Sequence, residues 1–444
     1  LPDRAIKKSR SAQISTVRLL LSIRRCSVAV ELFLSLHRLL PWCSRVLWRL
    51  NFCFLFPCVC LLKTWPLHQG KLLNLCEKAT RGHPTEMLLF LAVYVGPIVV
   101  AGISLCILYF MKSSKELPKN WDELVTEAWF QYHGVRGLAE DRINSRYNVV
   151  ELFKQPGRVA VMTGGNRGIG LKIVEKLLEC DMTVVLGVRN VESSRRAIAK
   201  EIPEEKSAGK LFLEQLDVGS MDSVRKFAAE IKKKYRKIHI LINNAGIMAA
   251  PFALTEDGFE SQMAINYLGH FLLTHLLLPE IVAAGEADRH SRIVNVSSCV
   301  HLMGDIDYEN FHGSKSYYGA TAYNQSKLAQ ILFTKHLQGL LVDRKLPVQV
   351  HACHPGVVDT DLFIHSSSTV IPWFKKALFK NPEQGSRTVV YAAISPKLEG
   401  KGGSYLSNCR LHRTHPMAKD PAACEKLFDY TKELLKIGDF GLPQ

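Results

Sequence analysis

The stretch Thr163-Gly164-Gly165-Asn166-Arg167-Gly168-Ile169-Gly170 decides the fold that this sequence predicts. It follows an apolar run at 158–162 and precedes a helical pattern, which is the setting of a glycine turn that binds a dinucleotide. In such a turn, missing side chains let backbone amides and a helix N-terminus approach phosphate oxygens. A glycine pattern alone is weakly specific, so other parts of the chain must supply the partners of such a site.

A second stretch, Tyr323-Asn324-Gln325-Ser326-Lys327, places a phenol and an ammonium four residues apart. On a helix this spacing puts both groups on one face, one turn apart. The phenol of tyrosine titrates near pH 10 and is a poor base at neutral pH, but a neighbouring cation favours the phenolate and lowers its pKa. The pair can therefore exchange a proton with a carbonyl oxygen, and together with the glycine turn it indicates a nicotinamide oxidoreductase.

Six apolar runs alternate with helical patterns from residue 158 onward. This rhythm predicts an α/β fold with a Rossmann-type, doubly wound parallel sheet that helices cover on both faces. Ligands of such sheets bind beyond the carboxyl ends of the strands. The predicted strands are 158–162, 183–188, 210–216, 238–242, 292–297 and 347–353.

Two arginines bear on the choice of cofactor. Arg189 ends the second predicted strand, where a carboxylate would bind the ribose 2′-hydroxyl of NAD and an arginine suits a 2′-phosphate. Arg167 adds a positive charge nearby, although either arginine alone could be a solvated surface residue. Together they favour NADP(H), with NAD(H) as the alternative. Asp217 is placed to accept a hydrogen bond from the adenine amine. The turn Asn243-Asn244-Ala245-Gly246 is placed to lie beside the adenine ribose.

With these motifs the sequence resembles the short-chain dehydrogenase/reductase family over about residues 157–440, and within it the retinol-dehydrogenase-like branch. The gap of 25 residues between Ser298 and Tyr323 is longer than in many members and is similar to that branch. The stretches that carry the resemblance are TGGNRGIG at 163–170, NNAG at 243–246, INYLGHF around Asn266, VNVSS ending at Ser298, YNQSK at 323–327 and HPGVVDTDL from His354.

The resemblance implies a catalytic set of Asn266, Ser298, Tyr323 and Lys327. Tyr323 would protonate a carbonyl oxygen as hydride arrives from the nicotinamide, and Ser298 would donate a hydrogen bond to that oxygen. Lys327 would also hold the nicotinamide ribose hydroxyls, and Asn266 would position a water that links Lys327 to solvent. The cofactor-binding residues implied are Gly164, Asn166, Arg167, Gly168, Ile169, Gly170, Arg189, Asp217, Val218, Asn244, Ala245, Gly246, Tyr323, Lys327, Pro355 and Gly356.

Residues 87–111 read MLLFLAVYVGPIVVAGISLCILYFM and contain no charge. The run is long enough to span about 30 Å of hydrocarbon, which predicts an N-terminal transmembrane anchor. A buried core helix or a cleaved signal peptide fits this run less well. Lysines follow at 112, 115 and 119, so with a start at Met87 the positive-inside rule places the catalytic domain in the cytosol, whereas the basic charges of residues 1–86, if these belong to the protein, leave the orientation open. We expect a single-pass protein of the endoplasmic reticulum.

Residues 1–86 differ in composition from the remainder of the chain. They carry +10 of the net charge of +16 and six of the twelve cysteines. We expect them to be poorly structured, either as an Arg-rich, acid-poor targeting segment or, as we favour, as non-native sequence upstream of a start at Met87. Residues 112–155 are then a linker or collar, and residues 156–440 form the catalytic domain.

Composition also argues against several other kinds of protein. Residues 87–444 carry only +6 and show no basic stripe, which argues against a nucleic-acid partner. Their cysteines are scattered singly, which favours a reducing compartment. The spacing Cys53-x4-Cys58-x-Cys60 lacks nearby histidines or a second cysteine pair, so we expect no metal site.

The segment Asp359–Asn381 is expected to cover the substrate. Ile371, Trp373 and Phe374 alternate there with lysines, which suits either a lid resting on anionic lipid or a lid packed on the protein. A lipophilic, isoprenoid or retinoid-like alcohol or carbonyl compound would then enter from the bilayer. The alternative function is a catalytically silent NADPH-binding scaffold, and the resemblance further implies a homodimer.

Overall fold

The computed structural model describes residues 118–202, 208–365 and 378–442. The chain divides into two units, Leu1–Leu108 and Tyr109–Gln444, and all described residues belong to the second. The expectations for residues 1–86, for the anchor at 87–111 and for the Ile371–Phe374 part of the lid fall outside the described residues. Within the described part, none of the helices has the length and hydropathy of a membrane span.

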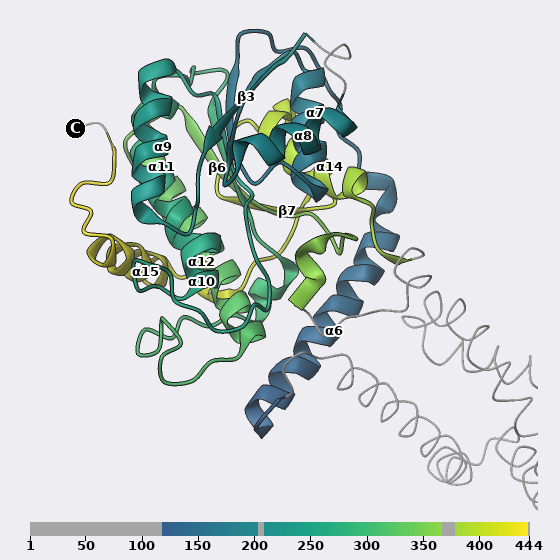
Figure 1. The fold of residues 1–444 in the computed structure, drawn as a ribbon, viewed down its shortest axis with the longest axis vertical. Coiled ribbons are helices and arrows are strands. Elements are labelled where there is room, and N and C mark those ends of the chain that lie inside the picture. The colour runs from purple at the N-terminus through teal and green to yellow at the C-terminus, as the bar shows by residue number, and fades with distance from the viewer. Residues whose placement is uncertain (1–117, 203–207, 366–377, 443–444) are drawn as a thin grey trace, which may run out of the picture. The chain divides into compact units, whose positions relative to one another are not determined.

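An eight-stranded sheet lies at the centre of the second unit, in the order β3-β2-β1-β4-β5-β6-β7-β8 (Figure 1). The first seven strands in this order are parallel, and β8 is antiparallel to β7. The order reverses direction at β1, so the crevice beyond the carboxyl ends of β1 and β4 is where such sheets bind ligands. The strands are β1 (Val159–Thr163), β2 (Thr183–Val188), β3 (Lys210–Gln215), β4 (Ile240–Asn243), β5 (Ser291–Val296), β6 (Val348–His354), β7 (Ser404–Ser407) and β8 (Arg410–Leu411).

Helices pack on both faces of this sheet, which confirms the predicted Rossmann-type class. One hydrophobic core joins the sheet to α7, α8 and α14, and another joins it to α9, α11, α12 and α15 (Figure 1). The central strands β4, β5 and β6 are buried along their whole length, as expected for strands covered on both faces. The helices are α7 (Gly168–Glu179), α8 (Val191–Glu201), α9 (Met221–Lys234), α11 (Gly269–Val282), α12 (Gly319–Asp343), α14 (Pro382–Ile394) and α15 (Pro421–Leu434).

Local sequence signals explain where these helices begin. The α14 helix starts with a capping box, in which the Asn381 side chain accepts from Gln384 and the Gln384 side chain accepts from Asn381, with Pro382 at the first turn. The α9 helix is capped by Ser220 and carries lysines in its last turn, where they complement the helix dipole.

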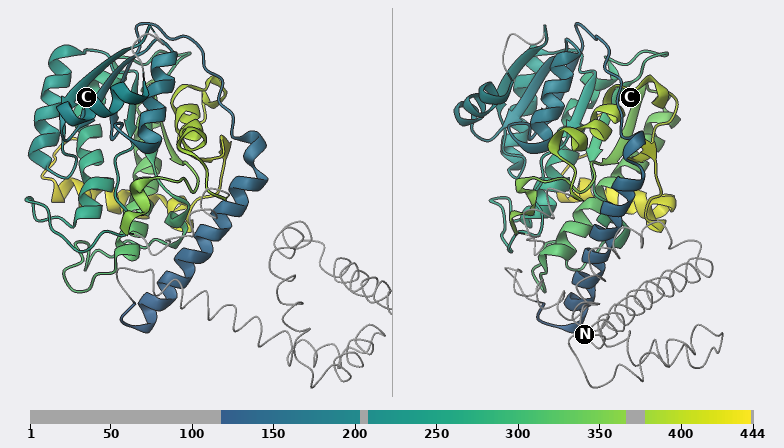
Figure 2. Two further views of the ribbon diagram at one scale, coloured as in Figure 1. Left: turned by 45° about the vertical axis from the view of Figure 1, so that its right-hand side comes forward. Right: turned by 90° about the vertical axis from the view of Figure 1, so that its right-hand side faces the viewer.

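The segment predicted as a linker contains one continuous helix, α6 (Trp121–Ile143), capped by Asn120. It packs against the short helix η5 (Cys299–Met303) and against α12, and it runs alongside the α/β unit in both views of Figure 2. The remaining short helices are η2 (Ser145–Tyr147), α10 (Ser261–Met263), the π-helical turn η4 (Ala264–Leu268), η6 (Asp361–His365), η7 (Pro396–Leu398) and η8 (Pro416–Lys419).

Candidate active site

The glycine turn lies between the end of β1 and the start of α7. Gly164 and Gly168 have φ angles of +69° and +55°, which a side chain would strain. A Cβ atom on Gly170 would lie 2.0 Å from the carbonyl oxygen of Gly164. The turn therefore folds so tightly on itself that only glycine fits at position 170. The first turn of α7 thus carries no side chain at Gly168 and Gly170, as the close approach of a phosphate requires.

Thr163 joins this turn to the neighbouring motif after β4. Its hydroxyl oxygen accepts hydrogen bonds from the backbone N–H groups of Asn244 and Ala245, both at 3.0 Å. The Asn244 side-chain amide donates back to the carbonyl oxygens of Thr163 and Gly164. The carboxyl ends of β1 and β4 are therefore fixed to each other, and the two cofactor motifs form one surface.

Ser298, Tyr323 and Lys327 meet at the adjoining end of the sheet. Ser298 follows β5 and caps η5, whereas Tyr323 and Lys327 lie in the first turns of α12. All three side chains are buried, and the Tyr323 hydroxyl forms a hydrogen bond with Ser298. The Lys327 ammonium lies 5.6 Å from the centroid of the Tyr323 ring and donates to the Val296 carbonyl oxygen at 2.9 Å.

Burial governs the acidity of this pair. It raises the pKa of the Tyr323 phenol above its usual value, although the hydrogen bond with Ser298 opposes the rise. Burial also lowers the pKa of Lys327 to about 8. In the protein without cofactor, desolvation of the phenol therefore outweighs any opposing effect of Lys327 on the tyrosine pKa, since the ammonium is directed at Val296. A lowering of this pKa by Lys327 together with the oxidised nicotinamide stays a prediction.

The lowered pKa of Lys327 gives an expected pH dependence of stability. The pKa of Lys327 is near 10.5 in the unfolded chain and about 8 in the folded chain. Below pH 8 the folded chain therefore buries a charged ammonium, and this cost lowers the free energy of unfolding by its full amount. That cost disappears as the pH rises from 8 to 10.5. We expect the free energy of unfolding of the wild-type chain to rise over this window by on the order of 3 kcal/mol relative to Lys327→Met. Denaturant unfolding of both chains measures this difference, and parallel pH curves would contradict it.

Asn266 lies in the π-helical turn η4, and both the nitrogen and the oxygen of its side-chain amide form hydrogen bonds within the protein. Its amide nitrogen donates to Ile247 O at 2.9 Å and to Ser326 Oγ at 3.0 Å, and its oxygen accepts from Ile247 N at 2.9 Å. A Cβ atom on Gly246 would lie 3.1 Å from Asn266 Oδ1 and 3.5 Å from Lys327 Nζ. Asn266 thus lies beside Lys327 and fixes the loop after β4. The water expected between Lys327 and solvent stays a prediction.

His270 connects the two halves of the site, which the sequence did not indicate. Its Nε2 lies 2.9 Å from Thr163 Oγ1, and its Nδ1 lies 3.3 Å from Asn266 O. Because the Thr163 hydroxyl already accepts two backbone N–H groups, its proton points at Nε2, and we infer that the ring carries its own proton on Nδ1. Burial lowers the pKa of His270 to about 3, so the ring is neutral and links the glycine turn to Asn266.

The two arginines expected near the 2′-position differ in their surroundings. Arg189 is exposed at the end of β2, and within the described residues its guanidinium makes no ion pair. Arg167 is also exposed, but its Nη1 lies 3.2 Å from Asp361 Oδ2. Arg189 therefore offers its full charge to a ligand, whereas Arg167 shares its charge with a carboxylate.

The other residues of the expected cofactor surface lie at the same sheet edge, after β1, β3 and β6. The Asp217 carboxylate accepts from Gly219 N at 2.9 Å, and Val218 is buried. The Asn166 amide donates to Ser194 Oγ at 3.2 Å. Ile169 packs near Gly385 of α14. Pro355 and Gly356 directly follow β6.

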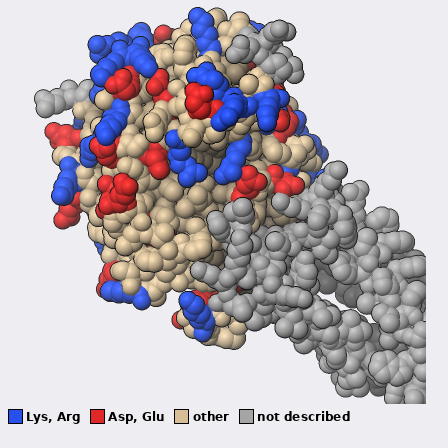
Figure 3. Space-filling view, in the orientation of Figure 1, with Lys and Arg blue, Asp and Glu red and all other residues tan. Residues whose placement is uncertain are grey.

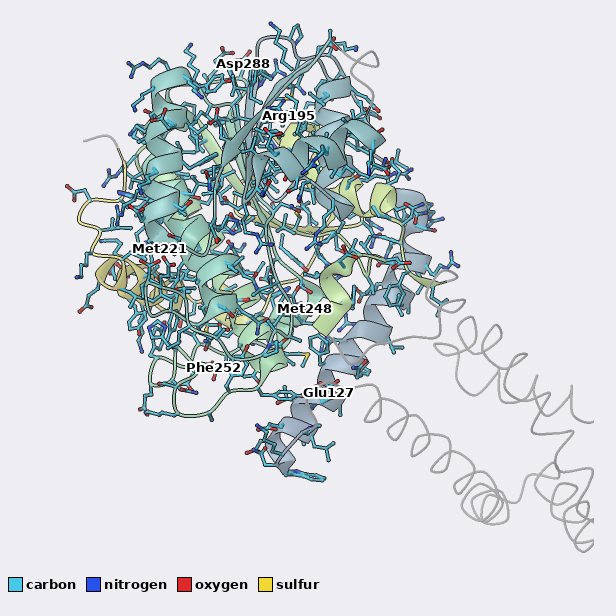
Figure 4. All side chains as sticks on the ribbon, in the orientation of Figure 1. Glu127, Arg195, Met221, Met248, Phe252 and Asp288 are labelled. Carbon is cyan, nitrogen blue, oxygen red and sulfur yellow. The ribbon has the colours of Figure 1, made fainter. Side chains whose placement is uncertain are left out.

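An apolar cluster surrounds Tyr323. It brings together Phe130 from α6, Met248 from the loop after β4 and Val300 from η5, and Leu362 and Phe363 of η6 pack against it. Met248 lies at the same end of the unit as Phe252 and Glu127 in Figure 4, whereas Arg195 and Asp288 lie at the opposite end. The ring of Tyr323 is therefore packed among apolar side chains.

Comparison with known proteins agrees with this geometry. A family model described as short chain dehydrogenase matches residues 158–370. A polyprenol dehydrogenase from Danio rerio is 40% identical over 307 residues, which cover 68% of this chain and 94% of the relative. Retinol dehydrogenase 11 from Homo sapiens is 38% identical, over 64% of this chain and 87% of its own length. A solved structure of an uncharacterised protein from Mycobacterium paratuberculosis is 33% identical, with a TM-score of 0.54, over 66% of this chain and 98% of its own.

The fold, the motifs and these relatives define the class of protein. The chain belongs to the short-chain dehydrogenase family, in its retinol-dehydrogenase-like branch. It is an NAD(P)-dependent oxidoreductase that acts on alcohol or carbonyl groups. This agrees with the resemblance seen in the sequence alone.

Proposed function

We propose that this protein transfers a hydride between NADP(H) and the alcohol or carbonyl group of a lipophilic, isoprenoid or retinoid-like substrate at a membrane. One observation carries the proposal. Tyr323, whose hydroxyl is hydrogen-bonded to Ser298, lies inside an apolar cluster one helical turn from a buried lysine, and a dinucleotide-type glycine turn follows β1 of the same sheet.

Each residue of the set has a role that its position supports. NADPH supplies the hydride when it is bound. The Tyr323 hydroxyl donates its proton to the carbonyl oxygen, and Ser298 donates a hydrogen bond to the same oxygen, since the two hydroxyls are already hydrogen-bonded to each other. Lys327 holds the ribose and favours the phenolate that is left, and Asn266 keeps the loop beside Lys327 in place.

The preference for NADP(H) rests on Arg189. Because this arginine makes no ion pair within the described part of the chain, Arg189→Leu should raise the KM for NADPH about tenfold or more and leave the KM for NADH unchanged. Arg167→Leu should have a smaller effect on the KM for NADPH, because Asp361 already shares the charge of Arg167. Steady-state kinetics with both cofactors measure these values. Equal changes for NADPH and NADH would contradict the assignment of Arg189 to the 2′-phosphate.

A lipophilic substrate is supported by the lining of the site and by the relatives. The side chains packed around Tyr323 are apolar, so a hydrocarbon chain can replace water beside the reacting carbonyl. The relatives are named as dehydrogenases of polyprenol and of retinol. Both names describe alcohols with isoprenoid chains, which agrees with the substrate class proposed from the sequence.

A location at the membrane is supported by residues 87–111 and by the surface of α6. Trp121, Val125, Trp129 and Tyr132 form one stripe along α6 and are exposed. Tryptophan and tyrosine favour the interface between membrane and water, and this stripe begins ten residues after the uncharged run. In Figure 3 the lower part of the visible face is also largely uncharged. We therefore propose a single-pass protein of the endoplasmic reticulum with a cytosolic catalytic domain.

A substrate panel tests the proposed function. The full-length chain in detergent micelles is mixed with NADPH and with aldehydes and ketones of increasing chain length, including isoprenoid and retinoid members, and NADPH oxidation is followed by absorbance. We expect kcat/KM to rise with hydrocarbon length. Turnover of short soluble carbonyls alone would contradict a lipophilic substrate, and no turnover of any member would favour the scaffold alternative.

A further inference from the structure

A buried ion pair lies between α6 and the loops at the carboxyl end of β6. Asp141, near the end of α6, and Lys380, just before α14, are 2.9 Å apart from Oδ1 to Nζ. Their side chains are only 5% and 7% exposed. Burying two charges is costly unless they are paired and their remaining hydrogen-bonding positions are filled, so this pair needs further partners.

Asn408, which follows β7, supplies the first of these partners. Its amide nitrogen donates to Asp141 Oδ1 at 3.0 Å, and its oxygen accepts from Lys380 Nζ at 2.8 Å. Asn408 itself is buried. The three side chains therefore form a closed polar cluster, in which each charge contacts both of the other members.

The remaining hydrogen bonds of the pair hold the turn that follows β6. Asp141 Oδ2 accepts from Val357 N at 2.9 Å, and Lys380 Nζ donates to Pro355 O at 3.3 Å. The residue between them, Gly356, has a φ angle of +99°. A Cβ atom at this position would lie 2.6 Å from both Asp141 Oδ2 and Lys380 Nζ. Gly356 thus leaves room for the ion pair, which contacts the turn on both sides.

This turn adjoins the strand that carries Ser298. Ser297 N donates to Cys353 O at 2.8 Å, so the residues after β5 and after β6 leave the sheet side by side. One turn before Asp141, Gly137 packs against Val357 Cγ2 and Cys299 Sγ, because a Cβ atom there would lie 3.2 and 3.5 Å from them. The C-terminal part of α6 therefore contacts both the Ser298 segment and the turn after β6.

We propose that Asp141 is a positioning residue for cofactor binding: through Lys380 it holds the Pro355–Gly356 turn in the shape that receives the nicotinamide end of the dinucleotide. This inference rests on the proposed function, because it takes Pro355 and Gly356 to be among the residues that bind the dinucleotide, as the family resemblance implies. It makes α6 part of the catalytic domain. It also assigns a role to a buried charge that lies outside every motif of the sequence.

Two variants separate positioning from stability. Asp141→Leu together with Lys380→Met removes both charges, so neither charge is left buried without its partner. Because Asn408 and the turn lose hydrogen bonds, we expect a folded chain whose thermal midpoint lies several degrees below that of wild type. The same double variant leaves Val357 N and Pro355 O without their partners, so the dissociation constant for NADPH should rise at least tenfold. Asp141→Asn alone keeps an acceptor for Val357 but leaves Lys380 without its counter-charge. It should raise the dissociation constant about fivefold and lower the thermal midpoint.

NADPH fluorescence on the full-length chain in micelles measures the dissociation constant, and thermal unfolding measures stability. Asp222→Asn is the matched control, because Asp222 also pairs with a lysine, Lys226, but on the exposed face of α9. This control should leave both values unchanged. A folded double variant with wild-type affinity would overturn the proposal. If the double variant does not fold, wild-type affinity in folded Asp141→Asn would overturn it instead. A wild-type chain that binds no NADPH would overturn the proposed function as well.

Discussion

Tyr323→Phe is expected to lower kcat for NADPH-dependent carbonyl reduction by about a hundredfold to ten-thousandfold, the usual contribution of a positioned proton donor. Phenylalanine occupies the same buried space, so the ring stays in the apolar cluster and beside Lys327. Only the hydroxyl that forms the hydrogen bond with Ser298 is lost. The dissociation constant for NADPH should therefore change little. Single-turnover kinetics measure the rate, and NADPH fluorescence measures the binding.

The matched control is Tyr430→Phe on α15. Tyr430 packs against Tyr308 and Phe311 in the other half of the unit, so loss of its hydroxyl should leave kcat unchanged. A Tyr323→Phe enzyme with a rate within threefold of wild type would remove Tyr323 from the chemistry. If Tyr323→Phe abolished turnover but still restored the phenotype of cells that lack the protein, the result would favour the catalytically silent scaffold.

Gly170→Ala is expected to have the second-largest effect, through the shape of the glycine turn. The added methyl carbon would lie 2.0 Å from Gly164 O and 2.9 Å from Gly165 Cα, and both are backbone atoms that cannot rotate away. Either the turn opens or the first turn of α7 shifts. We expect a loss of about 3 kcal/mol in the free energy of unfolding, at the upper end of overpacking costs. We also expect NADPH affinity to fall at least tenfold.

Gly339→Ala in α12 is the control for this substitution. Nothing lies within 4 Å of a Cβ atom at Gly339, and alanine in a helix interior is favoured over glycine by roughly 0.5–1 kcal/mol. This variant should be slightly more stable than wild type and bind NADPH equally well. If both variants behaved alike in thermal unfolding and NADPH binding, the tight glycine turn would not be what the site requires.

Local patterns in the sequence predict much of this fold. Each of the six apolar runs contains a strand, and the runs of the central strands are uninterrupted because these strands are buried on both faces. The edge strand β3 instead alternates exposed and partly buried residues. β7 was missed because it has only four residues and follows two glycines, and β8 because it has only two. α6 was predicted only as part of a linker or collar, since its contacts with η5 and α12 leave no periodic signal in its own sequence.

The parts of the site formed by residues that are close together in the chain could also be predicted from the sequence. Tyr323 and Lys327 share one face of one helix, and the glycine turn follows its strand directly. Properties that depend on tertiary packing could not be predicted from the sequence. The rise in the tyrosine pKa comes from burial, and the pairing of Asp141 with Lys380 joins residues that are far apart in the chain. His270 resembled an ordinary core histidine until its contacts with Thr163 and Asn266 were known.

The central claim is that this site moves a hydride between NADPH and a carbonyl carbon, with Tyr323 supplying the proton. The most direct test uses NADPH that carries two deuterium atoms at C4 of the nicotinamide, with the best lipid aldehyde of the panel and mass spectrometry of the product. Our account predicts an alcohol with one deuterium on the former carbonyl carbon, formed by the wild-type chain and, at a strongly reduced rate, by Tyr323→Phe. An alcohol without deuterium, or equal rates for the two chains, would contradict it.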